Sequence, residues 1–204
     1  MKKYNLICKI RRRNPYRRMM KASQEHRTCE NKLNREFKQK TPYKFFSTDI
    51  SYLFYTGGLA YLSALKDIAS GEIIAWEISE RTNMELVLNT IEYLKESKDI
   101  HSFENILIHS DQGVHYTNPV YINKIKDLGV IQSMSRKGNC LDNAPIESFF
   151  GHMKDEVDYK DCKTFEQLRT LISNYMNYYN NGRQQWNLKK MTPVQYTSHL
   201  LTQK

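Results

Sequence analysis

The stretch FFSTDISYLFYTGGLAYLSALKDIASGEIIAWEIS, residues 45–79, decides the fold of this chain. It contains three runs rich in aromatic and β-branched residues, which favour strands. Gly57-Gly58 separates the first run from the second, and Ser70-Gly71 separates the second from the third. Short connections that contain glycine join neighbouring strands running in opposite directions. The stretch therefore predicts an antiparallel meander of three strands.

Helical and strand patterns alternate downstream of this meander. Apolar residues recur at helical spacing over residues 83–97. An apolar run at 105–109, a helix beginning near Pro119 and a short strand at 130–133 follow. Because helical crossovers join parallel strands, we expect the two later strands to pair in parallel. This order is ribonuclease H-like, and it predicts an α/β fold with a five-stranded mixed sheet flanked by helices.

Three acidic residues occupy positions that such a fold would bring together. Asp49 lies in the first strand run, Asp111 follows the fourth, and Glu147 falls early in a helical pattern, with 35 residues between the last two. Strands one and four are neighbours in this fold, so Asp49 should lie beside Asp111. Carboxylates suit Mg²⁺ or Mn²⁺. Two such ions about 3.5–4 Å apart clamp the attacking and leaving oxygens of a phosphoryl displacement.

The helix expected from about Asn143 has two different faces. Its apolar face consists of Ile146, Phe150, Met153 and Val157. Glu147 and Lys154 are seven residues apart and lie together at about 100° from that face. Lys154 is therefore a candidate contact to a phosphate beside the ions, although a solvated helix charge is the alternative. A long helix over 164–180 and a short one after Thr192-Pro193 complete the prediction.

Each acidic residue also has an ordinary structural explanation. A salt bridge could compensate Asp49, Asp111 could belong to an Asp-Gln-Gly turn, and Glu147 could be an exposed helix residue. Burying an unpaired carboxylate in a strand is costly, which favours metal ligation for Asp49. His109 and His115 flank Asp111, but hard Mg²⁺ prefers oxygen, so we assign neither as a ligand.

Four strings of residues, in order, extend this interpretation to a family. TDISYL, HSDQGVHY, SRKGNCLDNAPIESFFGHMK and YNNGRQQWNLKKMTP together resemble the OrfB-type transposases of bacterial insertion sequences, and the resemblance covers almost the whole chain. It implies a retroviral-integrase-like core with a D, D, 35, E motif. Asp49, Asp111 and Glu147 match its catalytic, metal-binding triad, and Lys154 matches its usual basic residue. It implies element-end cleavage and DNA strand transfer with two Mg²⁺ or Mn²⁺ ions per active site.

The same resemblance implies a set of partners. These are double-stranded DNA, as terminal inverted repeats and target DNA, further copies of the chain in a homo-multimer, and an upstream OrfA-type protein. No apolar run approaches the roughly 20 residues of a membrane span, so we expect no membrane and a bacterial cytoplasmic, nucleoid-associated protein. Two other functions stay open. One is a nuclease of this fold that does not join, and the other is a truncated, non-catalytic remnant acting as a DNA-binding or oligomer-poisoning regulator.

Positive charge is concentrated near the N-terminus. Residues 1–44 hold 15 Lys and Arg against 3 Asp and Glu, whereas residues 45–204 hold 16 against 19. We therefore predict two domains, a basic, mostly helical DNA-binding arm over 1–44, the tail of a truncated helix-turn-helix part, and a catalytic core over 45–204. The arm should bind phosphates in a salt-dependent way, with a solvated tail as the alternative. Deleting residues 1–40 should weaken DNA binding and leave the core folded.

Glycine and charge over Ser135–Asp142 predict a mobile loop that could close over DNA. For Asn139, Asp142 and Asn143, loop structure, helix capping and DNA contact are all open. The residues predicted to contact DNA are Arg11, Arg12, Arg13, Arg17, Arg18, Arg136, Lys137, Asn143 and Lys154.

The cysteines predict neither disulfides nor zinc. Cys8, Cys29, Cys140 and Cys162 show no CxxC spacing, so free thiols are expected. A zinc site at His26 and Cys29 is disfavoured because the second His and the CxxC pair are missing.

Overall fold

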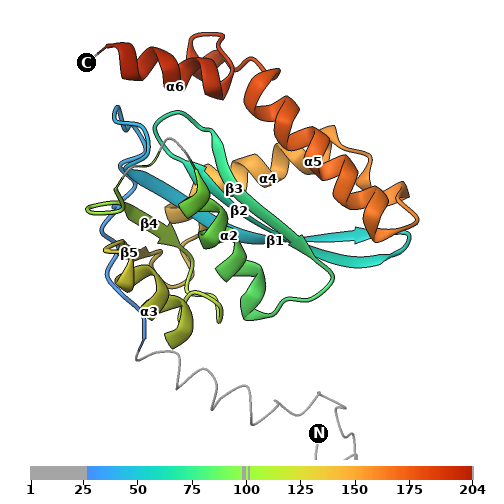
Figure 1. The fold of residues 1–204 in the computed structure, drawn as a ribbon, viewed down its shortest axis with the longest axis horizontal. Helices are drawn as coiled ribbons and strands as arrows, with labels where there is room; N and C mark the ends of the chain where they lie inside the picture. Colours follow the sequence, from blue (N-terminus) through green and yellow to red (C-terminus); the bar gives the residue numbers. More distant parts are fainter. Residues whose placement is uncertain (1–26, 98–99, 101, 204) are drawn as a thin grey trace, which may run out of the picture.

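The computed structural model describes residues 27–97, 100 and 102–203 (Figure 1). Strands and helices alternate along the chain in the predicted order. The strands are β1 (Phe45–Tyr55), β2 (Gly58–Asp67), β3 (Ile73–Ser79), β4 (Leu107–Ser110) and β5 (Ile131–Met134). The α-helices are α2 (Met84–Glu96), α3 (Pro119–Asp127), α4 (Ala144–Glu156), α5 (Phe165–Asn181) and α6 (Pro193–Thr202). Short 3₁₀ turns are η2 (Cys140–Asn143), η3 (Tyr159–Asp161) and η4 (Trp186–Leu188).

The strands form one mixed sheet in the order β3-β2-β1-β4-β5. The pairs β1–β2 and β2–β3 are antiparallel, and the pairs β1–β4 and β4–β5 are parallel. The predicted meander, the parallel extension and the neighbouring first and fourth strands are therefore confirmed.

Each face of the sheet has its own apolar core, because successive side chains of a strand point to opposite faces. On one face, Leu53 of β1 packs in a cluster with Phe149 of α4 and Tyr179 of α5. On the other face, Phe46 of β1 packs in a cluster with Val87 of α2 and residues of α3. The helices therefore cover the sheet on both sides (Figure 1).

Polar residues define where the last two helices begin. Thr164 accepts a hydrogen bond from the Gln167 backbone N–H at the start of α5. Thr192 and Gln195 form a reciprocal capping box at the start of α6, where Pro193 occupies the first turn. No helix in the described residues is long and apolar enough to cross a membrane.

The described part of the predicted arm, residues 27–44, is not helical. The mostly helical structure predicted for the arm is wrong over this part, because Asn34 and Arg35 adopt left-handed backbone angles with φ of 46° and 61°. The segment instead packs on the sheet. Leu33 is buried in a cluster with Ile68, just after β2, and Leu107 of β4, and the Met134 N–H of β5 donates to the Glu30 carbonyl at 3.4 Å.

Several sequence predictions fall outside the described part of the chain. Arg11, Arg12, Arg13, Arg17, Arg18, Cys8 and His26 lie within residues 1–26. Cys29 and Cys162 are free thiols, as expected.

Candidate active site

The parallel pairing of β1 with β4 brings the first two predicted carboxylates together. Ser47 pairs with His109 in this register. Two residues further along the strands, Asp49 follows Ser47 and Asp111 follows His109. Both aspartates therefore emerge at the same level of adjacent strands, where β4 ends.

Local backbone contacts orient each aspartate. The Asp49 Oδ1 accepts a hydrogen bond from the Ile50 N–H at 2.7 Å. The Asp111 Oδ1 accepts one from the Gly113 N–H at 2.8 Å, so the predicted Asp-Gln-Gly turn is real. A Cβ at position 113 would lie 2.8 Å from the same Asp111 oxygen, so a larger residue there would displace this carboxylate. The turn thus orients Asp111 and does not exclude a role as a ligand.

Glu147 lies in the first turn of α4, near enough to Asp111 for the charge of Asp111 to raise its pKa. A carboxylate there interacts favourably with the helix dipole. The predicted apolar face of α4 is buried, and Phe149 joins it. Because this face packs against β1 and β2, α4 lies across the sheet with the exposed Glu147 outside the core.

The three carboxylates influence each other's ionisation. Burial raises the pKa of Asp49 to about 7, with the charges of Asp111 and Glu147 adding to the effect. Burial also raises the pKa of Asp111. The pKa of Glu147 is raised by partial burial and by the charge of Asp111. The three carboxylates are therefore near enough to influence one another's charge, and their joint role as ligands stays a prediction.

Lys154 lies near this acidic group, two turns along α4 from Glu147. Burial lowers the pKa of its ammonium, and the nearby Asp49 charge raises it. None of the ion pairs among the described residues involves Lys154 or the three carboxylates. The site therefore combines excess negative charge with one half-buried cation.

Three carboxylates beside one lysine leave an excess of negative charge, which hard divalent cations can neutralise. A bound cation lowers the pKa of neighbouring carboxyl groups and so favours their ionised form. Oxygen ligands are those that Mg²⁺ and Mn²⁺ prefer. Within the described residues, however, no three His, Cys, Asp or Glu side chains lie close enough to form a finished metal cluster. Exposed Glu147 is the carboxylate with most freedom to move toward the pair of aspartates.

His109 is a buried neighbour of the site and not a ligand in this structure. Its two ring nitrogens lie 2.9 Å from the Ser133 hydroxyl and 3.1 Å from the Ser135 hydroxyl. Burial lowers the pKa of His109 to about 4, so the ring is neutral near pH 7. It therefore braces β4 against β5 beside Asp111.

Asp142 is the centre of an ion-pair network that the sequence did not reveal. Its side chain is fully buried and accepts hydrogen bonds from the Asn31 amide, from the Arg35 guanidinium, and from the Arg136 backbone and guanidinium. The side-chain hydrogen bond from Arg136 holds the pKa of Asp142 well below the usual carboxyl range. The open question about Asp142 is thus answered in favour of loop structure. Sequence patterns did not reveal these contacts, because Asn31 and Arg35 are separated from Asp142 by more than 100 residues.

Asn143 also differs from the expected DNA contact. It is 2% exposed, and its side-chain NH₂ donates to the Thr48 carbonyl at 3.1 Å. Thr48 directly precedes Asp49, so Asn143 joins the start of the Glu147 helix to the Asp49 strand. Lys137 lies exposed on the neighbouring loop, as a phosphate contact requires.

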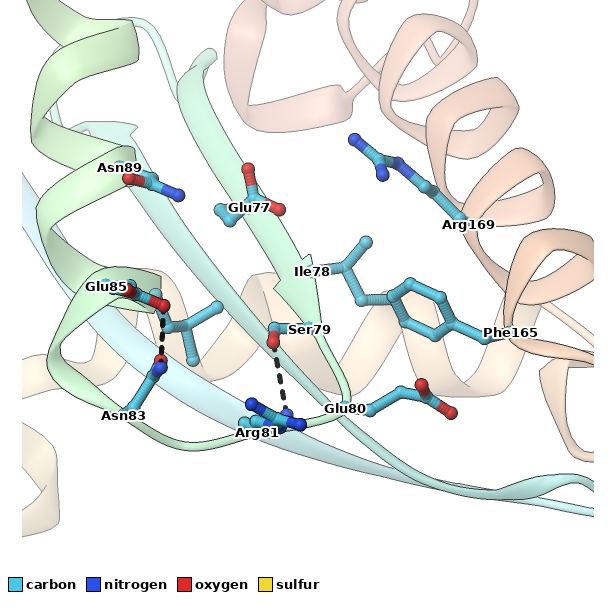
Figure 2. A pocket seen from close by; sticks show the side chains of 11 residues that line it. Glu77, Ile78, Ser79, Glu80, Arg81, Asn83, Glu85, Asn89, Phe165 and Arg169 are labelled. Atoms are coloured by element: carbon cyan, nitrogen blue, oxygen red, sulfur yellow. Dashed lines mark hydrogen bonds between the residues drawn. The ribbon is translucent and has the colours of Figure 1, made fainter.

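A separate surface hollow of about 380 Å³ lies between β3, the start of α2 and the start of α5 (Figure 2). Its lining carries charges of both signs, including Glu77, Glu85, Arg81 and Arg169. None of the three predicted active-site carboxylates lines it. The predicted active site is therefore on a different part of the surface.

Comparison with known proteins agrees with the fold. Residues 39–140 and residues 147–201 each match a model described as an integrase core domain. The chain is 39% identical over 170 residues to the putative transposase InsK for insertion sequence element IS150 of Escherichia coli (strain K12), covering 83% of this chain and 59% of that protein. It is 39% identical over 178 residues to an uncharacterized transposase-like protein of Haemophilus influenzae, covering 85% of this chain and 79% of that protein.

A solved structure shows the same architecture. The HTLV-2 integrase catalytic core domain in complex with magnesium superposes with a TM-score of 0.59 at 15% identity, over 77% of this chain and 97% of that domain. The fold is therefore that of an integrase core domain. The chain belongs to the IS3 family of insertion-sequence transposases, with an OrfB-like sequence. It spans about three fifths of the length of the Escherichia coli relative.

Proposed function

We propose that this chain is the catalytic part of a transposase that cleaves DNA at the ends of an insertion sequence and joins the ends to target DNA. The observation that carries the proposal is the placement of Asp49 and Asp111 on adjacent strands, with the charges of Asp111 and Glu147 raising the pKa of Asp49. None of the three carboxylates has an ion-pair partner in the described residues. Bound cations would reduce the electrostatic repulsion among these carboxylates.

In the proposed mechanism the two aspartates and Glu147 would hold two Mg²⁺ or Mn²⁺ ions. Such ions would activate the attacking oxygen and stabilise the leaving oxygen of an in-line displacement. Cleavage is attack by a water oxygen on phosphorus, and the departing 3′-oxygen takes up a proton as a 3′-hydroxyl. Joining is attack by that 3′-oxygen on a target phosphodiester, which displaces another 3′-oxygen.

Basic residues position the DNA in this proposal. Lys154 is close enough to Asp49 for their charges to interact, so its ammonium can hold a phosphate beside the reacting one. Lys137 and the exposed part of Arg136 add positive charge on the loop before α4, and Arg136 stays paired with Asp142. The basic N-terminal arm contributes further phosphate contacts.

The wider assignment follows from the family. A relative of known fold binds magnesium as a catalytic core domain. We extend this to terminal inverted repeats as the specific DNA, to a homo-multimer that synapses two ends, to an OrfA-type partner and to a bacterial cytoplasmic setting at the nucleoid.

The test uses the purified full chain, Mg²⁺, and duplexes carrying the DNA that flanks its reading frame, both intact and precut. Asp49→Asn, Asp111→Asn and Glu147→Gln should each abolish cleavage and joining while the melting temperature stays within a few degrees of wild type. Asp127→Asn and Glu166→Gln are matched controls, since both carboxylates are exposed and distant from the triad in sequence.

Near-wild-type activity in any triad variant removes that residue from the site. Cleavage without joined product from precut ends would identify a nuclease. Tight DNA binding by a wild-type chain that neither cleaves nor joins would identify a non-catalytic regulator.

A further inference from the structure

Trp186 is the most exposed of the large apolar side chains in the described residues, at 84%. It lies in η4, on the connection between α5 and α6. Single exposed apolar residues are common on protein surfaces and need no explanation by themselves. Three further observations concern the loop Gln185–Met191 that carries this side chain.

The first observation is that backbone hydrogen bonds and one buried side chain fix the loop. The Gln185 N–H donates to the Met191 carbonyl at 3.0 Å, and the Lys190 N–H donates to the Gln185 carbonyl at 3.0 Å. Leu188 is buried beneath the loop. A closed loop anchored in this way holds Trp186 outward at little entropic cost on binding.

The second observation is strain at two consecutive lysines. Lys189 and Lys190 have φ of 54° and 62°, in the left-handed region that side chains other than those of glycine and asparagine rarely adopt. Backbone strain of this kind persists where the surrounding structure enforces it, and it concentrates at ligand-binding positions. Both lysine side chains of this turn are exposed, and the Lys190 ammonium lies over the indole.

The third observation is charge. The last 38 residues, 167–204, contain five Lys and Arg and no Asp or Glu. Residues 45–166 hold 11 Lys and Arg against 19 Asp and Glu, a balance of −8. The loop is therefore a basic surface on an acidic body, which attracts a polyanion.

The side chains of the loop are arranged for such a ligand. The Lys190 Nζ lies 4.6 Å from the centre of the Trp186 ring. The Lys189 Nζ lies 2.9 Å from the Nε2 of His199 on α6. No ion pair among the described residues gives either lysine a carboxylate partner. Both positive charges are therefore available to phosphates.

The loop is also connected to the active-site helix. Leu188 and Lys66 both pack around Gly71, where a Cβ would lie 3.8 Å and 3.7 Å from their side chains. The Lys66 Nζ in turn donates to the Pro145 carbonyl at 3.1 Å, two residues before Glu147. The loop thus lies near the start of α4.

We propose that the Gln185–Met191 loop binds DNA at a duplex end or an unpaired flank, with Trp186 stacked on an exposed base and Lys189 and Lys190 on phosphates. This inference rests on the proposed function, because it assigns a DNA contact to the same protein. Base faces are accessible only at duplex ends and in unpaired strands, which is where an aromatic side chain can stack. An apolar protein partner fits the loop less well, since its neighbours Gln184, Asn187 and Lys190 are polar.

The experiment uses the two tryptophans of the chain. In a Trp76→Phe variant of the full chain, Trp186 is the single indole, and its emission reports its surroundings. A duplex with a single-stranded 3′ overhang should quench this emission and protect it from acrylamide. A relaxed closed circular plasmid, which has no ends, should do so much less.

DNA affinity is measured separately, by fluorescence anisotropy of labelled DNA. These measurements use variants that keep Trp76, so they do not depend on the Trp76→Phe substitution. Trp186→Ala should weaken binding of the overhang duplex by at least about fivefold, and Trp186→Phe should restore most of that affinity. The double variant Lys189→Ala, Lys190→Ala should lower the slope of log affinity against log salt by about two. Lys160→Ala, Lys163→Ala is the matched control, since both lysines are exposed elsewhere on the body.

Unchanged Trp186 emission at saturating DNA, together with unchanged affinity of Trp186→Ala, overturns this inference. Cleavage and joining by the same wild-type preparation, assayed in parallel, show in that case that the proposed function stands. A wild-type chain that binds neither DNA overturns both.

Discussion

At the scale of single residues, one buried carboxylate organises the segment that leads into α4. Asp142 gathers Asn31, Arg35 and Arg136 around one buried carboxylate. The network lies between the described arm, the loop after β5 and the start of α4. Its charge is compensated by two arginines, which is the arrangement that makes a buried carboxylate stable. Asp142 therefore defines how the loop leads into the active-site helix.

The network predicts an acid-sensitive fold. Because the folded-state pKa of Asp142 is lowered, its stabilising contribution is complete above the usual carboxyl pKa of about 4 and declines gradually as pH falls from there toward the folded-state pKa. Asp142→Asn should melt several degrees lower than wild type at pH 7, and the difference should shrink toward pH 3. Thermal melts at a series of pH values measure this. Asp127→Asn is the control, and parallel curves for wild type and Asp142→Asn would contradict the role of the ion pairs.

Lys154 provides a second test at this scale. Its ammonium shares a face of α4 with Glu147, away from the buried apolar face, so replacing it removes a phosphate-binding group and little packing. Lys154→Ala should lower the salt slope of DNA affinity by about one and leave the melting temperature nearly unchanged. Lys160→Ala gives the comparison. A variant that melts several degrees lower but binds DNA normally would make Lys154 structural.

At the scale of elements, the position of α4 relative to β1 decides whether the carboxylates can act together. The apolar contacts of Ile146 and Phe149 fix the distance of the helix from the sheet. The Asn143 hydrogen bond to the Thr48 carbonyl fixes where the helix begins along β1. A small shift of a catalytic group can cost a large factor in rate.

Asn143→Ala should therefore affect the reaction more than binding. We expect the rates of cleavage and joining to fall about tenfold, while DNA affinity changes little, because a buried amide does not touch DNA. Removing one hydrogen bond costs about 1 kcal/mol, which corresponds to a fall of a few degrees in melting temperature. Asn174→Ala, at an exposed position on α5, is the matched control. Weakened affinity with normal rates would instead return Asn143 to the DNA-binding residues.

The elements themselves could largely be predicted from the sequence, because their signals are local. Periodicity and glycine turns indicated the strand order, and that order placed Asp49 beside Asp111. The left-handed turn at Asn34, the burial of Leu33 and the Asp142 network could not be predicted, since they depend on contacts between segments far apart in the chain, more than 100 residues in the case of Asn31 and Asp142. The exposed Trp186 was missed for a similar reason, because only the folded loop shows that its ring does not join the core.

At the scale of the whole molecule, charge is divided between ends and body. Residues 1–44 and 167–204 are basic, with balances of +12 and +5, and residues 45–166 carry −8. An acidic body repels DNA, and it is this body that holds the carboxylates. The proposed function therefore requires the basic ends to bring DNA to the site.

The structure shows that less of the N-terminal arm can be deleted than the charge pattern suggested. Leu33, Asn31 and Arg35 belong to the folded body, so deletion of residues 1–40 should destabilise the core, contrary to the expectation from charge alone. Deletion of residues 1–26 is the cleaner cut, and it removes nine Lys and Arg and one Glu. The melting temperature of this shorter deletion should match wild type.

The shorter deletion should nevertheless weaken DNA binding and flatten its salt dependence by several units of slope, because binding releases about one counterion for each phosphate that a Lys or Arg neutralises. Anisotropy titrations of the full chain, the 1–26 deletion and the 1–40 deletion over a range of salt measure slope and affinity. Thermal melts of the same three proteins distinguish weaker phosphate binding from unfolding. If the 1–26 deletion keeps the wild-type slope, the basic N-terminal charge is solvated and DNA phosphates are bound by the core, with Lys154 and the Trp186 loop as the first positions to test.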